Sequence, residues 1–441
     1  MIYLVTKEQR LFDSSIYKII SVEESLSIMK DWKMIQFDTE TTGLDPHIDK
    51  SLMWQFGNID ETVQIIVDCS TVNPNQYKEI LENHFIIGAN LGFDCKFTFK
   101  ESIVPRKVYD CMIVEQLLYL GFPNFMIGAS SDIINVYCQI VENCPNWDTL
   151  NTKQRGAYIQ NASPEVSRFI TQHSGVSLKA MCYRYLKEDM DKSVRGEIIW
   201  RGIDDKTILY GAGDVKPLYR IMQAQLKILR QRDLVRAAKV ECDFVPVKAY
   251  YEWCGVHMNV PLWQKKMQQD ETKMNTALKK LNDFVVAFGD KRFFKVNLQG
   301  DLWEGFDTTP KCTINWNSTP QVIPFLTALG FNCKGIDKKT KEEKDSIDAS
   351  VLKPQRDVNP EFYDVYLAYS EAHKVCTTYG QNYINAINPY TKRIHTQFRS
   401  LGTDTGRLAC GSQQQNTSLA KLKGLPLRTP KDPKLKCAYP Q

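Results

Sequence analysis

Residues 34–44 read MIQFDTETTGL, a short apolar segment that ends in two carboxylates and a turn. Polar and apolar positions alternate up to residue 40, which predicts a β-strand. Side chains two apart on a strand point to the same face, so Asp38 and Glu40 are placed to bind the same ions. Gly43 and Pro46 then predict a loop. An acidic pair at a strand end is weak evidence on its own, because surface acids are common there.

Two more polar blocks lie further along the chain. Asn90 and Asp94 follow a predicted buried strand at 85–88, where a helix can begin. Asn90 is there either a helix cap or a ligand-facing residue, and Asp94 lies on the first helical turn. Tyr210 and Asp214 are four apart on a predicted helix, so they share one face and can enter the same cleft.

The helix that would carry Tyr210 and Asp214 also contains Gly211 and Gly213. Each glycine costs about 1 kcal/mol relative to alanine inside a helix. This cost makes sense where backbone or ligand must approach the helix closely.

Four carboxylates converge if these blocks meet: those of Asp38, Glu40, Asp94 and Asp214. Like charges in one pocket repel and raise one another's pKa unless cations lie between them. Mg²⁺ prefers oxygen ligands and keeps several waters, which suits phosphate chemistry. Two such ions about 3.5–4 Å apart stabilise both the attacking and the leaving oxygen of an in-line displacement. Together the blocks therefore predict a metal-dependent nuclease.

The composition is that of an intracellular globular protein. Its 441 residues, 43% hydrophobic and 24% charged, suffice for roughly two or three domains of about 150 residues each. We see neither a signal peptide nor an apolar stretch of about 18 residues, so we expect a soluble, cytoplasmic chain with no membrane partner. The 13 cysteines show no Cys-x-x-Cys pair, which predicts free thiols rather than zinc ligands or disulfides.

The pattern of predicted elements changes near residue 230. Before it, strands alternate with helices, which predicts an α/β layer architecture. In this part we expect an edge strand at 1–5, one long helix at 207–233 and an inserted helical region at 121–173. The charge-dense run 337–345 predicts a solvated hairpin tip. After residue 230 the patterns are helical, at 236–254, 261–288, 319–329, 348–353 and 359–387.

Positive charge is concentrated in residues 396–441. This segment holds eight lysines and arginines against two aspartates, whereas the whole chain has a net charge of +5. A basic segment on a near-neutral body suggests contact with a polyanion. A solvated basic tail explains the charges equally well, so both interpretations stay open.

The three blocks resemble the three motifs of the 3′–5′ exonuclease domain of the DEDD superfamily. They are FDTETTGL at 37–44, NLGFD at 90–94 and Y-x-x-x-D at 210–214. The tyrosine form is indicated, because the histidine form carries its histidine one position earlier, where this chain has Leu209. Shorter fragments of the same family are found at 108–112, 177–179 and 191–193.

This resemblance implies a ribonuclease H-like fold and a site for two divalent cations, Mg²⁺ or Mn²⁺. It implies that Tyr210 orients the attacking water. The residues implied to contact the 3′-terminal nucleotides are Leu44, Asn90 and Phe93. The implied metal ligands, which with Tyr210 form the catalytic set, are Asp38, Glu40, Asp94 and Asp214. Asp110 is interpreted as structural, since that set is already complete.

The second half of the chain resembles the thumb and the start of the palm of family A DNA polymerases. The most specific match is TDTGRL at 403–408, in which Arg407 is implied to bind DNA. Weaker matches lie at 241–256, 314–321 and 392–398. The implied domains are an exonuclease domain, a mainly α-helical thumb-like region and an incomplete palm, at 1–230, 231–395 and 396–441.

The polymerase resemblance is incomplete. Nucleotidyl transfer needs two carboxylates that hold metal against an incoming triphosphate, and after Arg407 the sequence offers only Asp432. We therefore expect no polymerisation from this chain alone. The palm and fingers would be supplied by a separate polypeptide, or be lost through truncation or interruption of the gene.

The expected function is proofreading 3′–5′ exonucleolysis of DNA during replication, in a bacterial or virus-infected host cell. Its partners would be a single-stranded DNA 3′ end and primer–template duplex. Two alternatives stay open: an exoribonuclease of the same superfamily, and a non-catalytic subunit that grips primer–template duplex. The intact set of four acids and a tyrosine argues against the second alternative.

Overall fold

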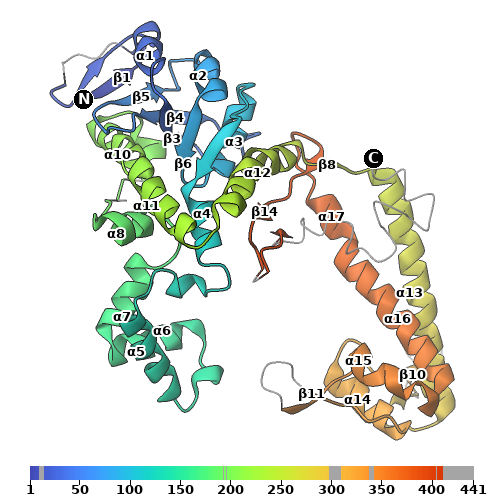
Figure 1. The fold of residues 1–441 in the computed structure, drawn as a ribbon. Helices are drawn as coiled ribbons and strands as arrows, with labels where there is room; N and C mark the ends of the chain where they lie inside the picture. Colours follow the sequence, from blue (N-terminus) through green and yellow to red (C-terminus); the bar gives the residue numbers. More distant parts are fainter. Residues whose placement is uncertain are drawn as a thin grey trace. The chain divides into compact units, whose positions relative to one another are not determined.

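The computed structural model describes residues 1–8, 14–191, 193–194, 196–296, 309–336, 342–403 and 405–410 (Figure 1). These residues form two compact units. The first unit holds the described part of Met1–Val256 and Asn388–Lys421, and the second holds that of His257–Ile387. Each unit has its own hydrophobic core.

A seven-stranded mixed sheet forms the centre of the first unit. Its strand order is β2-β1-β5-β4-β3-β6-β7. β4 runs antiparallel to its neighbours β3 and β5, and the other pairs are parallel. The strands are β1 (Ile2–Val5), β2 (Tyr17–Ile19), β3 (Met34–Thr41), β4 (Ser51–Gly57), β5 (Gln64–Asp68), β6 (Phe85–Gly88) and β7 (Lys107–Asp110).

The sheet confirms the predicted α/β architecture and corrects one prediction. β1 was predicted to be an edge strand, but it pairs in parallel with β2 on one side and β5 on the other. β2 therefore forms that edge of the sheet. The prediction was wrong because the short segment Tyr17–Ile19 gives no strong strand pattern of its own.

Apolar side chains of the central strands build the main core of this unit. Phe37, Trp54 and Phe56 are at most 1% exposed, and their rings pack edge-on or tilted against one another. Every position of β5 is buried, which means that both faces of the sheet are covered there. The continuous buried run of β3 ends at Phe37, and the half-buried Asp38 and Glu40 flank buried Thr39, so the two carboxylates lie where the core meets solvent.

Helices cover the sheet. Those before the insertion are α1 (Val22–Met29), η1 (Pro74–Tyr77), α2 (Lys78–Asn83), α3 (Leu91–Lys100) and α4 (Cys111–Leu118). Those after it are α8 (Leu178–Leu186), α9 (Ile198–Arg201), α10 (Asp205–Val215), α11 (Leu218–Gln231) and α12 (Val235–Cys254). α10 packs on β3, β4 and β5, which brings its side chains to the end of β3.

The prediction of a single helix at 207–233 is wrong. The chain forms two helices there, α10 and α11, which are separated by Lys216 and Pro217. Pro217 has no N–H to donate, and it stands at the N-cap of α11. The break lets the two helices pack differently: α10 lies on β3, β4 and β5, whereas α11 packs mainly on α4 and α8 and also touches α12 and β6.

The predicted inserted helical region between α4 and α8 is present in the structure. It has a small apolar cluster of its own, in which Ile140, Ile159 and Val166 are buried. Its elements are η2 (Asn124–Met126), α5 (Ser131–Glu142), η3 (Trp147–Thr149), α6 (Thr152–Ala162), α7 (Pro164–Arg168) and η4 (Phe169–His173).

The first compact unit extends further than the exonuclease domain predicted at 1–230. α12 belongs to it because this helix packs on α3, α4 and β7. Residues after Asn388 also belong to it, and Arg393 Nε donates to the carbonyl oxygen of Cys254 at 2.6 Å. The short strands of this part are β8 (Val256–His257), β13 (Arg393–Ile394), β14 (Phe398–Arg399) and β15 (Ala409–Cys410).

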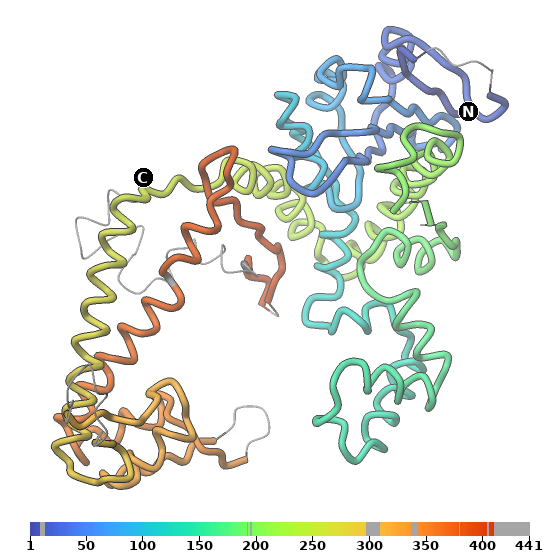
Figure 2. Tube along the Cα trace, turned by 180° about the vertical axis from the view of Figure 1, so that it is seen from behind, coloured from blue at the N-terminus to red at the C-terminus, as the bar shows by residue number. Residues whose placement is uncertain are grey.

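Two long helices, α13 (Val260–Phe288) and α16 (Pro360–Tyr379), run side by side through the second unit (Figure 2). At one end they enclose an aromatic core in which Trp316, Phe325 and Phe362 are at most 4% exposed. The remaining elements are β9 (Phe294–Lys295), β10 (Lys311–Cys312), α14 (Thr319–Ala328), β11 (Lys334–Ile336), β12 (Glu343–Asp345), α15 (Ala349–Leu352), η5 (Lys353–Val358) and α17 (Gln381–Asn385). The mainly helical character predicted for this region is confirmed.

Two predictions for the second unit are refined. β11 and β12 pair antiparallel as the arms of the predicted hairpin, while its tip at 337–341 lies outside the described residues. The helix predicted at 359–387 breaks at Gly380, between α16 and α17. A Cβ at Gly380 would collide with the carbonyl oxygen of Cys376, so glycine permits this close turn.

The described cysteines from Cys69 to Cys376 are free thiols. Among the residues that the structure describes, none of the helices combines the length and apolar character needed to cross a bilayer.

Candidate active site

Three carboxylates from two distant parts of the sequence meet at the end of β3. One oxygen each of Asp38, Glu40 and Asp214 lies within 4.8 Å of the other two. Asp38 and Glu40 come from β3, and Asp214 comes from α10, 174 residues after Glu40. All three supply hard oxygen donors, the kind that Mg²⁺ and Mn²⁺ prefer. The donor set therefore fits a divalent cation.

Gly211 lets α10 approach the sheet closely enough to form this cluster. A Cβ at Gly211 would lie 2.7 Å from Met53 Cε and 3.0 Å from Gln55 Cγ, both on β4. Met53 and Gln55 stand opposite Glu40 and Asp38 in the β3–β4 pairing. A larger residue at 211 would require the Met53 and Gln55 side chains to shift, so glycine gives α10 its close fit on β4. Gly211 therefore fits the prediction that a glycine in this helix permits close approach of neighbouring backbone or ligand. At Gly213 a Cβ would have no neighbouring atom within 4 Å.

Asp94 lines the same cavity but is not within the 4.8 Å cluster. It is 2% exposed on α3, and its Oδ1 accepts a hydrogen bond of 2.6 Å from Thr39 Oγ1. Burial raises the pKa of Asp94 to about 7; the Thr39 bond opposes this rise, and the charges of Asp110 and Glu40 add to it. A bound cation would offset the cost of ionising this buried carboxyl.

Tyr210 is buried on the face of α10 that carries Asp214. Burial raises the pKa of its phenol well above the ordinary value, and the carboxylates of Asp214 and Glu40 raise it further. Tyr210 therefore stays protonated at neutral pH. It can position a water through its hydroxyl group, but it is not suited to act as a base.

The carboxylates open into a cavity of about 680 Å³. The residues that were predicted to contact the terminal nucleotides all line this cavity: Leu44, Asn90 and Phe93. Leu44 is 78% exposed, which is unusual for a large apolar side chain and suits contact with a base. Residues in its wall that the sequence did not single out for this site include Thr39, Met112, Ile199 and Lys179. The sequence could have pointed to Lys179, since this residue belongs to the fragment at 177–179 that resembles the exonuclease family.

Asn90 is at the N-cap position of α3, but its side chain makes no capping hydrogen bond. Its backbone is left-handed, with φ of 70°, a conformation that asparagine tolerates. Its N–H donates instead to Asp110 Oδ1 at 2.9 Å. The same oxygen accepts from Met112 N and Ile113 N at the start of α4. The capping role is thus wrong for Asn90, and Asp110 has the structural role that was predicted.

The loop that carries Leu44 is anchored at its far side. The His47 ring stacks on Trp253 with centroids 4.1 Å apart, and it lies 4.3 Å from the His395 ring. Asn388 Nδ2 donates to Asp45 Oδ2 at 2.9 Å. The polymerase-like segment after residue 388 therefore holds the Leu44 loop in place.

Arg407 is exposed and is not among the residues that line this cavity. Its N–H donates to Thr403 Oγ1 at 3.0 Å within a tight turn. The basic segment beyond residue 410 lies outside the described residues.

Comparison with known proteins identifies both halves of the chain. Residues 15–230 match the family described as 3′–5′ exonuclease, and residues 302–436 match DNA polymerase family A. The thermostable DNA polymerase I of Thermus aquaticus is 34% identical over 126 residues, which cover 28% of this chain and 14% of that protein. The enzyme of the same name from Thermus filiformis is 26% identical over 221 residues, covering 50% of this chain and 22% of that protein.

Among solved structures, the POL domain of Pol1 from M. smegmatis, in complex with DNA primer-template and dNTP, is similar with a TM-score of 0.60. The identity is 13%, and the alignment covers 94% of this chain and 56% of that chain. At this identity the likeness shows the fold alone.

The sheet, the carboxylate cluster and the exonuclease match define a divalent-metal-dependent nuclease domain of the ribonuclease H-like class. Residues 302–436 match the DNA polymerase family A, and the curated relatives of this chain include DNA polymerase I enzymes. The matched stretches span less than a quarter of the length of the two Thermus relatives.

Proposed function

We propose that this chain removes nucleotides from the 3′ end of DNA and thereby proofreads the product of a family A polymerase. The observation that carries the proposal is the approach of Asp38, Glu40 and Asp214 to within 4.8 Å in a cavity that also contains Tyr210. Three carboxylates at this separation repel unless a cation joins them.

In this proposal Asp38, Glu40 and Asp214 bind divalent metal directly, and Asp94 completes the site from the α3 side. Two bound Mg²⁺ or Mn²⁺ ions would activate the attacking water and stabilise the leaving 3′ oxygen. Thr39 keeps the Asp94 carboxylate oriented through its 2.6 Å hydrogen bond. Leu44, Asn90 and Phe93 hold the terminal nucleotides, and the product is a nucleoside 5′-monophosphate.

Tyr210→Phe should lower the exonuclease rate by up to about 100-fold, because misplacing a reacting group by about 1 Å can cost this much. The affinity for Mg²⁺ should change little, since the phenol is protonated and is a poor metal ligand. Initial rates measured against Mg²⁺ concentration test this. A variant that loses metal affinity in proportion to its rate would show that Tyr210 acts on the metal site instead.

The substrate is tested with matched single-stranded DNA and RNA oligonucleotides labelled at the 5′ end. We expect stepwise shortening of the DNA from its 3′ end, abolished by EDTA and restored by Mg²⁺ or Mn²⁺. Equal or faster shortening of RNA would favour an exoribonuclease. Salt-dependent duplex binding without any metal-dependent turnover would favour the non-catalytic alternative.

A proofreading role further requires that mispaired ends be preferred. Unpairing a terminal base costs less when it is mismatched, so a mispaired 3′ end should enter the cavity more often.

In the same proposal Arg407 contacts primer–template duplex, a separate polypeptide carries the rest of the palm and fingers, and the protein acts in the cytoplasm.

A further inference from the structure

Within the described part of the chain, one basic side chain lines the acidic cavity. Lys179 is the one lysine or arginine among the described residues that line it, and the half-buried side chain stands two residues into α8. Asp38, Glu40, Asp94 and Asp214 line the same cavity. A nucleic-acid strand that enters brings further negative charge, so a cation in this wall has an evident use.

Among the residues that the structure describes, no fixed partner accounts for the position of Lys179. Within the described part of the chain, Lys179 forms neither an ion pair nor a side-chain hydrogen bond that would neutralise it. Lys179 acts only weakly on exposed Asp191. The pKa of Asp191 is lowered mainly by hydrogen bonds from Ser193 and in small part by the charge of Lys179. A lysine that served simply as a solvated surface charge would not need a place in the cavity wall.

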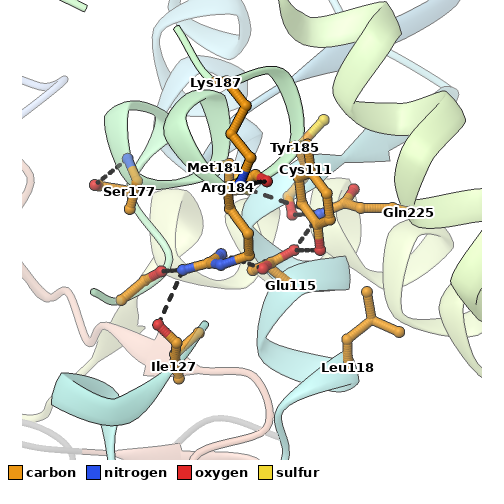
Figure 3. Close-up of polar contacts among 12 residues, drawn as sticks. Cys111, Glu115, Leu118, Ile127, Ser177, Met181, Arg184, Tyr185, Lys187 and Gln225 are labelled. Carbon is orange, nitrogen blue, oxygen red and sulfur yellow. Dashed lines mark hydrogen bonds and ion pairs between the residues drawn. The ribbon is translucent and has the colours of Figure 1, made fainter. Parts of the chain in front are cut away.

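A polar network around Arg184 and Glu115 ties α8, the helix that carries Lys179, to the rest of the unit (Figure 3). Ser177 caps the helix by accepting from Ala180 N at 3.2 Å. Arg184 Nη2 donates to the carbonyl oxygens of Gly175 and Ile127, at 2.9 and 3.0 Å, and Arg184 forms an ion pair with Glu115. One guanidinium thus ties both ends of the inserted helical region, and the chain entering α8, to the body of the unit.

Glu115 is itself fully buried and fixed from three directions. Tyr185 Oη and Gln225 Nε2 each donate to Glu115 Oε2 at 2.7 Å, in addition to the ion pair with Arg184. The backbone of Lys179 is therefore set by the core, while its side chain stays free to meet a ligand. This arrangement is pre-organised for binding.

We propose that Lys179 is a substrate-binding residue whose ammonium group contacts a phosphate of the single strand in the exonuclease cavity. The inference rests on the proposed function and deepens it. It assigns to α8 the recognition of the strand's backbone, which is independent of base sequence.

The test uses the full chain and a four-nucleotide single-stranded DNA, too short to reach far beyond the cavity. Three variants are compared with the parent: Lys179→Met, Lys179→Arg and, as a control for loss of one charge, Lys227→Met on the exposed side of α11. Equilibrium binding is measured in EDTA, where turnover is absent, over a range of salt concentrations. Cleavage is measured separately in Mg²⁺.

We expect Lys179→Met to weaken binding about tenfold and to reduce the slope of log K against log salt by about 0.7, as for one lost contact to a single strand. In the cleavage assay KM should rise more than kcat falls. Lys179→Arg should restore most of the affinity, and Lys227→Met should behave like the parent.

Unchanged affinity and salt slope in Lys179→Met would overturn the inference, as would an equal loss in Lys227→Met. The proposed function fails by a different observation, which is the absence of Mg²⁺-dependent cleavage by the parent chain. Binding in EDTA reports on Lys179 in either case.

A second oligonucleotide set locates the contact. Each member replaces one phosphate with a neutral methylphosphonate. At the phosphate that Lys179 contacts, this replacement should weaken binding by the parent and leave Lys179→Met unaffected. If no position shows such non-additivity, Lys179 does not contact a defined phosphate.

Discussion

Replacing both Asp38 and Glu40 with alanine should lower the exonuclease rate by at least about a thousandfold. The two side chains provide two of the three carboxylates that lie within 4.8 Å. Without them the site loses most of its affinity for metal and its means of activating water. Metal catalysis supplies several kcal/mol of transition-state stabilisation, and each 1.4 kcal/mol is tenfold in rate. The measurement is the initial rate of single-stranded DNA degradation in Mg²⁺.

The fold of this double variant should be intact, and its stability gives an independent readout. Removing two carboxylates that repel each other should leave the metal-free melting temperature unchanged or slightly raised. Added Mg²⁺ should raise the melting temperature of the parent but not that of the variant, because binding to the folded state stabilises it. A matched control is Asp31→Ala with Glu79→Ala, which removes two exposed carboxylates from the same unit. Retained nuclease activity in the Asp38/Glu40 variant would refute the assignment of the site.

Arg184→Met should destabilise the first unit by about 3–5 kcal/mol, the usual cost of leaving a buried charge without its partner. Glu115 is 0% exposed, and Arg184 is its ion-pair partner. The loss would also free the carbonyl oxygens of Gly175 and Ile127 from their shared donor. Urea unfolding monitored by hydrogen exchange in α4 and α8 measures the effect on this unit.

The control for Arg184 is Arg220→Met in the same unit. Like Arg184, Arg220 forms ion pairs, in this case with Glu61 and Glu188. Its side chain is 37% exposed, however. Exposed pairs contribute about 0–1 kcal/mol, so Arg220→Met should cost little. The double variant Glu115→Leu with Arg184→Met should be more stable than Arg184→Met alone, since it buries no unpaired charge. Equal stability of the two Arg184 variants would mean that the Glu115 charge is not what makes this site costly to break.

The elements around the site could be predicted wherever the local pattern matched one structure only. The strands predicted at 34–40 and 85–88 have alternating or continuous apolar patterns, and the structure has β3 and β6 there. Helices whose apolar positions recur regularly, such as α12 and α13, appear within one residue of their predicted bounds. The acidic blocks were recognisable because their order and spacing match a known family.

Other features could not be predicted because they depend on neighbours distant in sequence. The strand at 1–5 is internal only because β2 adds itself outside it. Asn90 does not cap its helix: its backbone is left-handed, with φ of 70°, rather than extended as in most cap residues. The division between α10 and α11 serves two different surfaces, the sheet and the α4–α8 pair.

By itself, the sequence determined the α/β class, because this follows from local periodicity; the candidate carboxylates, the tyrosine and the family came from motifs that resemble those of known proteins. Only the tertiary structure decided which carboxylates meet. Asp214 reaches Asp38 and Glu40 because Gly211 lets α10 settle on β4, whereas Asp94 is buried and bonded to Thr39. Distances between side chains on separate elements depend on how those elements pack, and no single segment carries that information.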